Sequence, residues 1–238
     1  MAGNSVNLLQ SGILLALSFS PMDLEQARYN MVESQIRTWE VLDQRVLDTL
    51  SAVKREDYVP DKYRPLAFVD MEIPLGHGEV MLAPKLEARM LQELTLKGSD
   101  RVLEIGTGSG YLTALLAALA GHVHSVEWHA DLSDSARARL AAHGVHNVTL
   151  EIGDAGRGWS RHAPYDAIVL TGSVPLLPKT LEAQLKPTGR LLAVVGDPPV
   201  MTARLVTSIG EGVYNEVGLF ETCIAPLRNV PQPERFIF

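Results

Sequence analysis

Three glycines at alternate positions, Gly106, Gly108 and Gly110, form the strongest chemical signal in the sequence. They lie between the strand-like run RVLEI and the helix-like run YLTALLAALA. Glycine lets the backbone turn tightly and approach a ligand closely, and the start of a helix offers unpaired N–H groups and a positive dipole end. The spacing is G-x-G-x-G, without the third glycine of the G-x-G-x-x-G dinucleotide fingerprint. We therefore interpret this stretch as a cofactor loop of a different kind.

Two acidic residues end the next two strand-like runs. Glu127 ends HVHSVE, and Asp154 follows NVTLEIG. At the first position an acidic side chain can accept both hydroxyls of a ribose, and at the second it could meet an adenine amino group. Each feature alone has a structural alternative: a tight turn for the glycines, a solvated strand end for Glu127 and a helix cap for Asp154. Their occurrence together at successive strand ends favours a cofactor that contains a nucleoside.

A second loop, residues 76–84, reads GHGEVMLAP and precedes a helix-like run. It carries one imidazole, one carboxylate and no hydroxyl. Its apolar residues Val80, Met81 and Leu82 are read equally well as packed core or as the wall of a pocket. The chemical question is what such a loop presents to a substrate.

Alternating elements must position these loops. Strand-like runs are RVLEIG, HVHSVE, NVTLEIG, YDAIVLTG and GRLLAVVG, and the helix-like runs YLTALLAALA and HADLSDSARARLAAHG separate the first of them. This alternation predicts an α/β fold, a doubly wound, mostly parallel Rossmann-like sheet with helices on both faces. The run ARLVTSIGEGVYNEVGLFETCIAPL, with a glycine-rich turn, predicts an antiparallel C-terminal hairpin at one edge.

The N-terminal part is expected to be a helical lead-in. We predict two short helices between residues 23 and 52, an irregular proline-rich stretch, and a helix PKLEARMLQELTL that begins at Pro84. One domain should cover residues 22–238, with the helices and the GHGEVMLAP loop in residues 22–98 and the cofactor-binding sheet in residues 99–238. Residues 1–21 are expected to be a disordered extension, with Met22 as an alternative start. A weak export signal is the rival interpretation, although no Lys or Arg precedes the short apolar run.

Composition narrows the classes of function. The chain has 238 residues, 46% of them hydrophobic, which suffices for one well-buried core. The formal charge of −7 opposes a polyanion, so we expect no nucleic acid partner, and no run predicts a membrane span. Cys223 is the only cysteine, and no Cys/His group has the spacing of a zinc site. We therefore expect no disulfide, no metal and a reducing, cytoplasmic setting.

The sequence resembles a known family over most of its length. VLEIGTGSGY, SVE, GDA, APYDAIVLTG and LEAQLKPTGRLLAVVG are similar to class I S-adenosylmethionine-dependent methyltransferases, and VKREDYVP and AFVDMEIPLGHG are similar to phrases of the protein-L-isoaspartate O-methyltransferase family. The likeness runs from about Arg28 to Leu227. It implies S-adenosylmethionine as cofactor, S-adenosylhomocysteine as product, and the carboxyl of isoaspartyl residues in damaged proteins as acceptor. The cofactor-binding residues that it implies are Glu104, Gly106, Thr107, Gly108, Ser109, Gly110, Glu127, Asp154 and Ala155.

The substrate loop departs from the family pattern. The family reads GxGQTISxP here, and its serine is treated as the catalytic residue. In this chain Val80 stands at the threonine position, Leu82 at the serine position and Glu79 at the glutamine position. The loss of both hydroxyl donors should cost orienting hydrogen bonds, and Glu79 would place a like charge beside a carboxylate substrate. The substrate loop is expected to comprise Gly76, His77, Gly78, Glu79, Val80, Met81 and Leu82.

Three functional hypotheses remain open at this stage. The first keeps isoaspartyl O-methylation and replaces the lost donors by His77, Thr171 or Ser173, since an ionised carboxylate needs alignment and not a general base. The second is a methyltransferase redirected to a more apolar or cationic acceptor, and the third is a non-catalytic module that binds the cofactor. The acceptor is accordingly a protein or peptide, or an unidentified small molecule, and the sequence predicts no oligomeric state.

Overall fold

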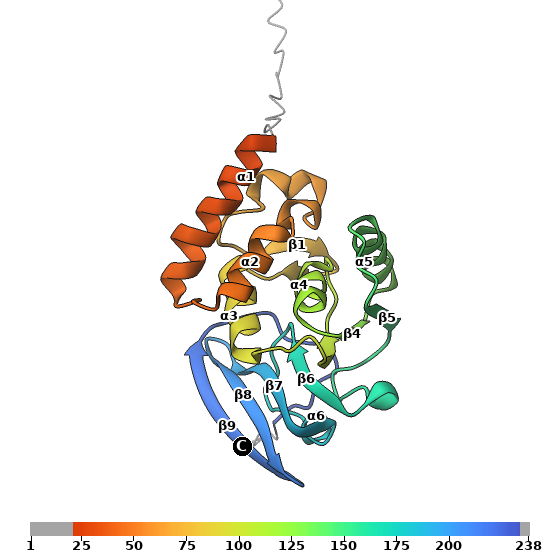
Figure 1. Cartoon of the computed structure of the whole chain (residues 1–238). Helices are drawn as coiled ribbons and strands as arrows, with labels where there is room; N and C mark the ends of the chain where they lie inside the picture. Colours follow the sequence, from red (N-terminus) through yellow and green to blue (C-terminus); the bar gives the residue numbers. More distant parts are fainter. Residues whose placement is uncertain (1–20, 234–238) are drawn as a thin grey trace, which may run out of the picture.

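The computed structural model describes residues 21–233, and a seven-stranded sheet forms their centre (Figure 1). The strands lie in the order β5-β4-β3-β6-β7-β8-β9. Neighbouring strands from β5 to β7 are parallel, and β7, β8 and β9 are antiparallel. This confirms the doubly wound, mostly parallel sheet with an antiparallel C-terminal hairpin. The strands are β3 (Arg101–Ile105), β4 (His122–Glu127), β5 (Val148–Ile152), β6 (Tyr165–Leu170), β7 (Leu185–Asp197), β8 (Val200–Gly210) and β9 (Val213–Glu221).

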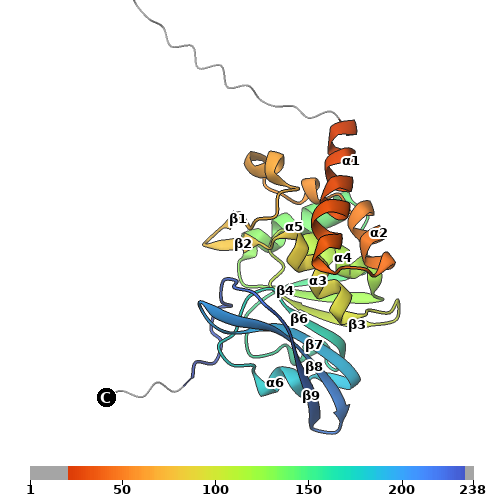
Figure 2. The same cartoon turned by 90° about the vertical axis from the view of Figure 1, so that its left-hand side faces the viewer.

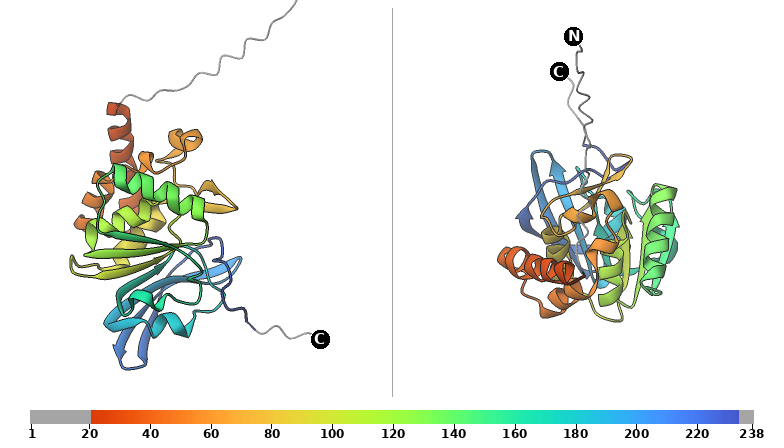
Figure 3. Two further views of the ribbon diagram at one scale, coloured as in Figure 1. Left: turned by 90° about the vertical axis from the view of Figure 1, so that its right-hand side faces the viewer. Right: turned by 90° about the horizontal axis from the view of Figure 1, so that it is seen from above.

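Helices cover both faces of the sheet, but unequally. In the left view of Figure 3 the green helices α4 and α5 lie over one face, and the cyan α6 lies under the other. One hydrophobic cluster joins the first face to α2–α5, and a second joins the opposite face to α6 and to residues near the C-terminus. The helices are α3 (Pro84–Leu94), α4 (Tyr111–Leu119), α5 (Ala130–Ala142) and the short α6 (Lys179–Glu182). Within residues 21–233 none of the helices is both long and apolar enough to cross a membrane.

The lead-in is helical, as predicted, with different boundaries. Helix α1 (Pro21–Asn30) continues through a π-helical turn, Met31–Ile36, and a 3-10 turn, Arg37–Trp39, before α2 (Gln44–Ala52) begins. The side chain of Asp43 accepts a hydrogen bond from the backbone N of Arg45 and so caps α2. Pro21 already belongs to α1, and residues 1–20 of the expected extension lie outside the described residues.

Two short strands, β1 (Ile73–Gly76) and β2 (Glu79–Met81), form an antiparallel hairpin that the sequence analysis did not predict. Its two-residue turn consists of His77 and Gly78, with φ of +55° and +84°. Two positive φ values are typical of tight hairpin turns because they match the twist of the strands. In Figure 2 this β1–β2 hairpin projects on the same side of the molecule as the dark-blue segment that follows β9.

Candidate active site

A pocket opens at the carboxyl ends of the parallel strands, where the strand order reverses between β3 and β6. Such a reversal is where ligands bind in open α/β sheets. Counted with the part that is open to solvent, the pocket comprises about 710 Å³ of space. Gly106, Gly108, Glu127, Asp154 and Ala155 all line it. The ends of three successive strands therefore meet at one cavity.

The glycine loop, residues 106–110 between β3 and α4, is shaped by close contacts. Gly106 has a φ of +98°, and a Cβ atom at this position would lie 2.1 Å from Oγ1 of Thr171. Gly110 caps α4 with a φ of +85°, and a Cβ there would lie 3.1 Å from the Cβ of Ala136. Larger residues at either position would therefore move the loop or its neighbours.

Glu127 connects the glycine loop to the turn between β4 and α5. Its Oε2 accepts a hydrogen bond from the backbone N of Gly108 at 2.8 Å, and its Oε1 accepts one from the backbone N of His129 at 3.0 Å. The residue is 5% exposed and lines the pocket. A carboxylate has about four acceptor sites, so two remain for hydroxyl groups in the pocket.

Asp154 also lines the pocket. Its Oδ1 accepts a hydrogen bond from the backbone N of Gly156 at 3.2 Å, and its Oδ2 accepts one from Nδ2 of Asn229 at 2.5 Å. Ala155, next to it, is buried. Asp154 is thus held at the pocket by its own turn and by the C-terminal part of the chain.

Glu104 lies beneath the glycine loop and lines neither this pocket nor the smaller one beside it. Its Oε2 accepts hydrogen bonds of 2.5 Å from the hydroxyls of Thr113 and Ser125, and Ser125 in turn contacts the hydroxyl of Thr107 at 2.6 Å. Burial raises the pKa of Glu104 to about 8, although both hydrogen bonds lower it. Glu104 therefore does not contact the pocket itself, and its hydrogen bonds connect it through Ser125 to Thr107 of the glycine loop.

The remaining residues of the glycine loop lie either at the smaller pocket or at the start of α4. Thr107 and Ser109 line the smaller adjoining pocket, together with Val80 and Leu82. Gly110 lines neither pocket and instead begins α4.

The C-terminal strap, residues 224–230, closes one side of the main pocket. Ala225, Pro226, Leu227 and Arg228 line the pocket. The backbone of Ser173 holds this strap, since its N donates to the carbonyl of Ala225 and its carbonyl accepts from the N of Leu227, both at 2.9 Å. Sequence reasoning did not assign the strap to the site, because neither periodicity nor a short motif marks it.

Arg228 joins the strap to the β1–β2 hairpin. Its Nε donates to Oε1 of Glu79 at 2.9 Å, and its Nη2 donates to the carbonyl of His77 at 2.9 Å. This ion pair reduces the expected like-charge conflict between Glu79 and an anionic substrate, because the arginine compensates the carboxylate. Within residues 21–233 the other three N–H groups of Arg228 make no hydrogen bond, so the Nη1 side can bind an anion.

The apolar residues of the substrate loop serve mainly as core. Met81 and Leu82 are 3% and 4% exposed, and Val80 is half-buried at the edge of both pockets. The fully buried guanidinium of Arg55 holds the end of this loop. It donates to the carbonyls of Leu82 and Ala67 at 2.7 and 2.9 Å and pairs with the carboxylate of Glu87.

None of the three side chains considered as replacement donors directs a free proton into the pocket. Thr171 lines it, but its hydroxyl donates to the carbonyls of Ile105 and Gly106 at 2.9 Å. Ser173 is buried and donates to the carbonyl of Ile224 at 3.1 Å. His77 lies outside the pocket lining, with its Nε2 2.8 Å from Oδ2 of Asp131. Arg228, which sequence reasoning missed, is the cationic donor at the pocket.

The sequence matches a family of known proteins over most of its length. The family model described as protein-L-isoaspartate(D-aspartate) O-methyltransferase matches residues 26–215. A protein-L-isoaspartate O-methyltransferase of Methylorubrum extorquens is 40% identical over 205 residues, which cover 86% of this chain and 90% of the relative. One of Rhodopseudomonas palustris is 42% identical over 198 residues, which cover 83% and 91%.

Solved structures show the same fold. One protein-L-isoaspartate O-methyltransferase superposes with a TM-score of 0.74 at 24% identity and covers 84% of this chain and 65% of that one. A Plasmodium falciparum protein described as a putative protein-L-isoaspartate O-methyltransferase, solved in complex with S-adenosyl-L-homocysteine, gives a TM-score of 0.71 at 20% identity and covers 86% and 98%.

Proposed function

Because the chain belongs to the protein-L-isoaspartate(D-aspartate) O-methyltransferase family, we infer that it transfers a methyl group from S-adenosylmethionine to the carboxyl of isoaspartyl residues in proteins. The chain is an S-adenosylmethionine-dependent methyltransferase. Nothing in the comparisons supports a redirected acceptor or a non-catalytic module. The role of each residue is argued below from the geometry of the pocket.

The main pocket fits the cofactor. S-adenosylmethionine supplies a methyl group on a positively charged sulfur and, after transfer, becomes S-adenosylhomocysteine. The buried carboxylate of Glu127 keeps acceptor sites for the two ribose hydroxyls, and Asp154 with Ala155 suits the adenine. Gly106 and Gly108 leave room for the amino-acid end, while Thr107 and Ser109 form the adjoining wall.

The acceptor carboxylate needs orientation more than activation. A free carboxyl is ionised at neutral pH, so its oxygen can attack the methyl carbon in line with the carbon–sulfur bond that breaks, and no proton has to be removed. We assign the orienting role to Arg228, whose unpaired N–H groups lie at the pocket beside Glu79 and Val80. The apolar side chains of Val80 and Leu82 help to exclude water.

The single observation that carries this proposal is that Glu127, Asp154 and Arg228 line one pocket. It brings a site for a nucleoside and a site for a carboxylate to the same cavity. A cationic acceptor would be repelled by Arg228, and the geometry gives no support to that alternative.

The test is methyl transfer from labelled S-adenosylmethionine to an isoaspartyl peptide, with the matching aspartyl peptide as control. We expect transfer to the isoaspartyl peptide alone, and the labelled ester should be released by mild base. Equal labelling of both peptides, or cofactor binding without transfer to either, would contradict the proposed specificity.

We also propose a protein or peptide as the physiological partner and the cytoplasm as the location. The single cysteine, Cys223, is exposed and unpaired, which suits a compartment that keeps thiols reduced.

A further inference from the structure

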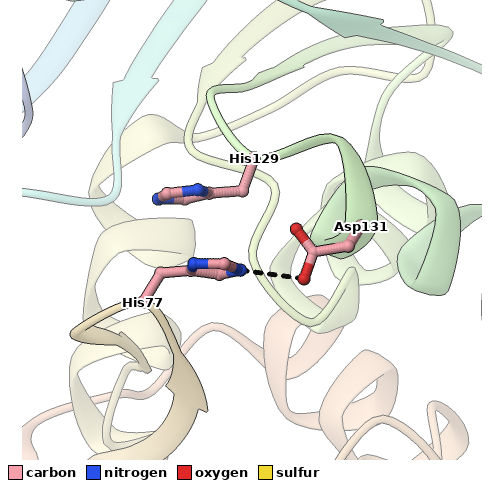
Figure 4. Close-up of side chains that lie close together, drawn as sticks. All are labelled: His77, His129 and Asp131. Carbon is pink, nitrogen blue, oxygen red and sulfur yellow. Dashed lines mark hydrogen bonds and ion pairs between the residues drawn. The ribbon is translucent and has the colours of Figure 1, made fainter.

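Two histidines from distant parts of the sequence stack face to face at the mouth of the pocket. His77 is in the turn of the β1–β2 hairpin, and His129 precedes α5 (Figure 4). Their ring centroids lie 4.1 Å apart, and the rings are inclined by only 10°. In Figure 4 the carboxylate of Asp131, in the first turn of α5, points toward the ring of His77.

The three side chains offer a set of metal ligands. One nitrogen from each imidazole and one oxygen of Asp131 all lie within 4.8 Å of one another. In a tetrahedral zinc site with bonds of about 2.0–2.2 Å, ligand atoms are roughly 3.4 Å apart. The rings of His77 and His129 are nearly parallel, so their in-plane lone pairs do not converge on one point in the stacked arrangement. The side chains of His77 and Asp131 are 43% and 68% exposed, so His77 can rotate out of the stack and bring the three ligand atoms around one ion.

The local polar contacts leave His129 incompletely satisfied. Within residues 21–233 its Nε2 is buried without a hydrogen bond, and Oε1 of Glu79 lies 3.5 Å away. Asp131 and Glu79 are both acidic, and Arg228 compensates only Glu79. Asp131 contacts Nε2 of His77 at 2.8 Å, and within residues 21–233 it forms no ion pair with a lysine or arginine. An ion at this place would replace that contact and meet two imidazoles and one carboxylate.

The backbone also holds His77 in an uncommon conformation. Its φ of +55° lies in the left-handed region, and both neighbours, Gly76 and Gly78, have positive φ as well. A tight hairpin turn requires this conformation, and histidine adopts it more often than most residues, so the turn fixes the place from which the His77 side chain extends.

We propose that His77, His129 and Asp131 bind a divalent transition-metal ion such as Zn²⁺. Two imidazoles and one carboxylate suit Zn²⁺, Ni²⁺ or Cu²⁺ better than Mg²⁺ or Ca²⁺, which prefer oxygen ligands. The ion ties the β1–β2 hairpin to the turn between β4 and α5. Both segments line the pocket, through Glu79 and Val80 on one side and Trp128 on the other, so the ion restricts opening of the pocket at its mouth.

A second cluster in the same protein provides a matched control. His124, Glu151 and His162 also bring three ligand atoms within 4.8 Å. Glu151, however, already accepts hydrogen bonds from Nε1 of Trp159 at 2.7 Å and from Arg161 at 2.6 Å. A guanidinium therefore already compensates this carboxylate, and metal binding should favour the first cluster.

The experiment is calorimetric titration of the full chain, without a polyhistidine tag, with ZnCl₂ in the absence of cofactor and peptide. We expect one ion per chain. His77→Ala and His129→Ala should each weaken binding by at least about tenfold, because even the loss of a group that only supports a ligand costs about 10–100-fold in affinity. Asp131→Asn, which can keep a hydrogen bond to His77, should weaken binding as well, and His162→Ala should leave it unchanged.

Hydrogen exchange gives an independent readout of the same variants. Zn²⁺ should slow amide exchange in residues 76–82 of the unmodified chain and not of His77→Ala. Absence of binding at about 100 μM Zn²⁺, far above the affinities typical of protein zinc sites, would overturn the proposal. So would binding that both histidine variants retain or that His162→Ala abolishes. Because no methyl transfer is measured, this outcome is independent of the proposed function.

Discussion

Arg228 and Glu79 form an ion pair of 2.9 Å between residues that are 149 positions apart in the sequence. It connects the C-terminal strap to the β1–β2 hairpin at the edge of the pocket. The glutamate stands where the family pattern has glutamine, and the arginine supplies the opposite charge. Glu79 alone would oppose an anionic substrate. Paired with Arg228, it instead helps to hold a cationic donor at the site.

Arg228→Ala should lower kcat/KM for an isoaspartyl peptide by roughly 10–100-fold, because a hydrogen bond to a charged group contributes about 1.5–3 kcal/mol. Part of this loss should come from the carboxylate of Glu79, which is left uncompensated. The double variant Arg228→Ala with Glu79→Gln should therefore recover some activity. Steady-state kinetics with peptide varied measures both effects, and equal activity of Arg228→Ala and the unmodified enzyme would exclude an orienting role.

Glu127→Ala and Asp154→Ala should each weaken S-adenosylmethionine binding. The effect of Glu127→Ala should be the larger, at about tenfold or more, because it removes two ribose contacts and also the acceptor for the N–H groups of Gly108 and His129. Calorimetry with the cofactor alone tests this. Glu211→Ala, in the exposed turn between β8 and β9, serves as control. Unchanged dissociation constants for both site variants would show that the cofactor lies elsewhere.

Val80→Thr should raise isoaspartyl activity, because it restores a hydroxyl at a half-buried position that lines both pockets. Leu82→Ser should behave differently. Leu82 is 4% exposed, and loss of its side chain from the core should lower the free energy of unfolding by about 2–4 kcal/mol. Activity and thermal denaturation are measured for each variant and for the pair. If Val80→Thr binds cofactor normally and shows no gain, the missing hydroxyl at position 80 does not limit the reaction.

The stability of the protein should decrease between about pH 5 and 8 because of Glu104. Burial raises its pKa in the folded state from 4.5 to about 8. In this window the folded protein holds a proton that the unfolded chain has released, so the free energy of unfolding falls as the pH rises. Glu104→Gln can still accept from Ser125 and Thr113 and does not titrate. Urea denaturation across this pH range should give a flatter dependence for the variant, and parallel curves would refute the assignment.

Much of the fold follows from local patterns in the sequence. The run RVLEI becomes β3, the glycines beside it form the loop, and YLTALLAAL becomes α4, because strand periodicity, glycine spacing and helix formation act over a few residues. Parallel strands have their carboxyl ends at one edge, and this placed Glu127 and Asp154 near each other in the prediction. The β1–β2 hairpin was missed because its strands are three to four residues long and contain a proline.

Tertiary structure alone decided how these local elements meet. The cofactor loop, the acidic strand ends and the family could be recognised before the structure was known, since each depends on residues close together along the chain. The sequence could not show that Arg228 compensates Glu79, that Leu82 is buried while Val80, which lines the same pockets, is only half-buried, or that His77 stacks on His129. Those relationships join positions 52 to 149 residues apart or depend on which face of a segment is buried. Such contacts arise only when the sheet and its surrounding segments pack together, because no local propensity specifies them.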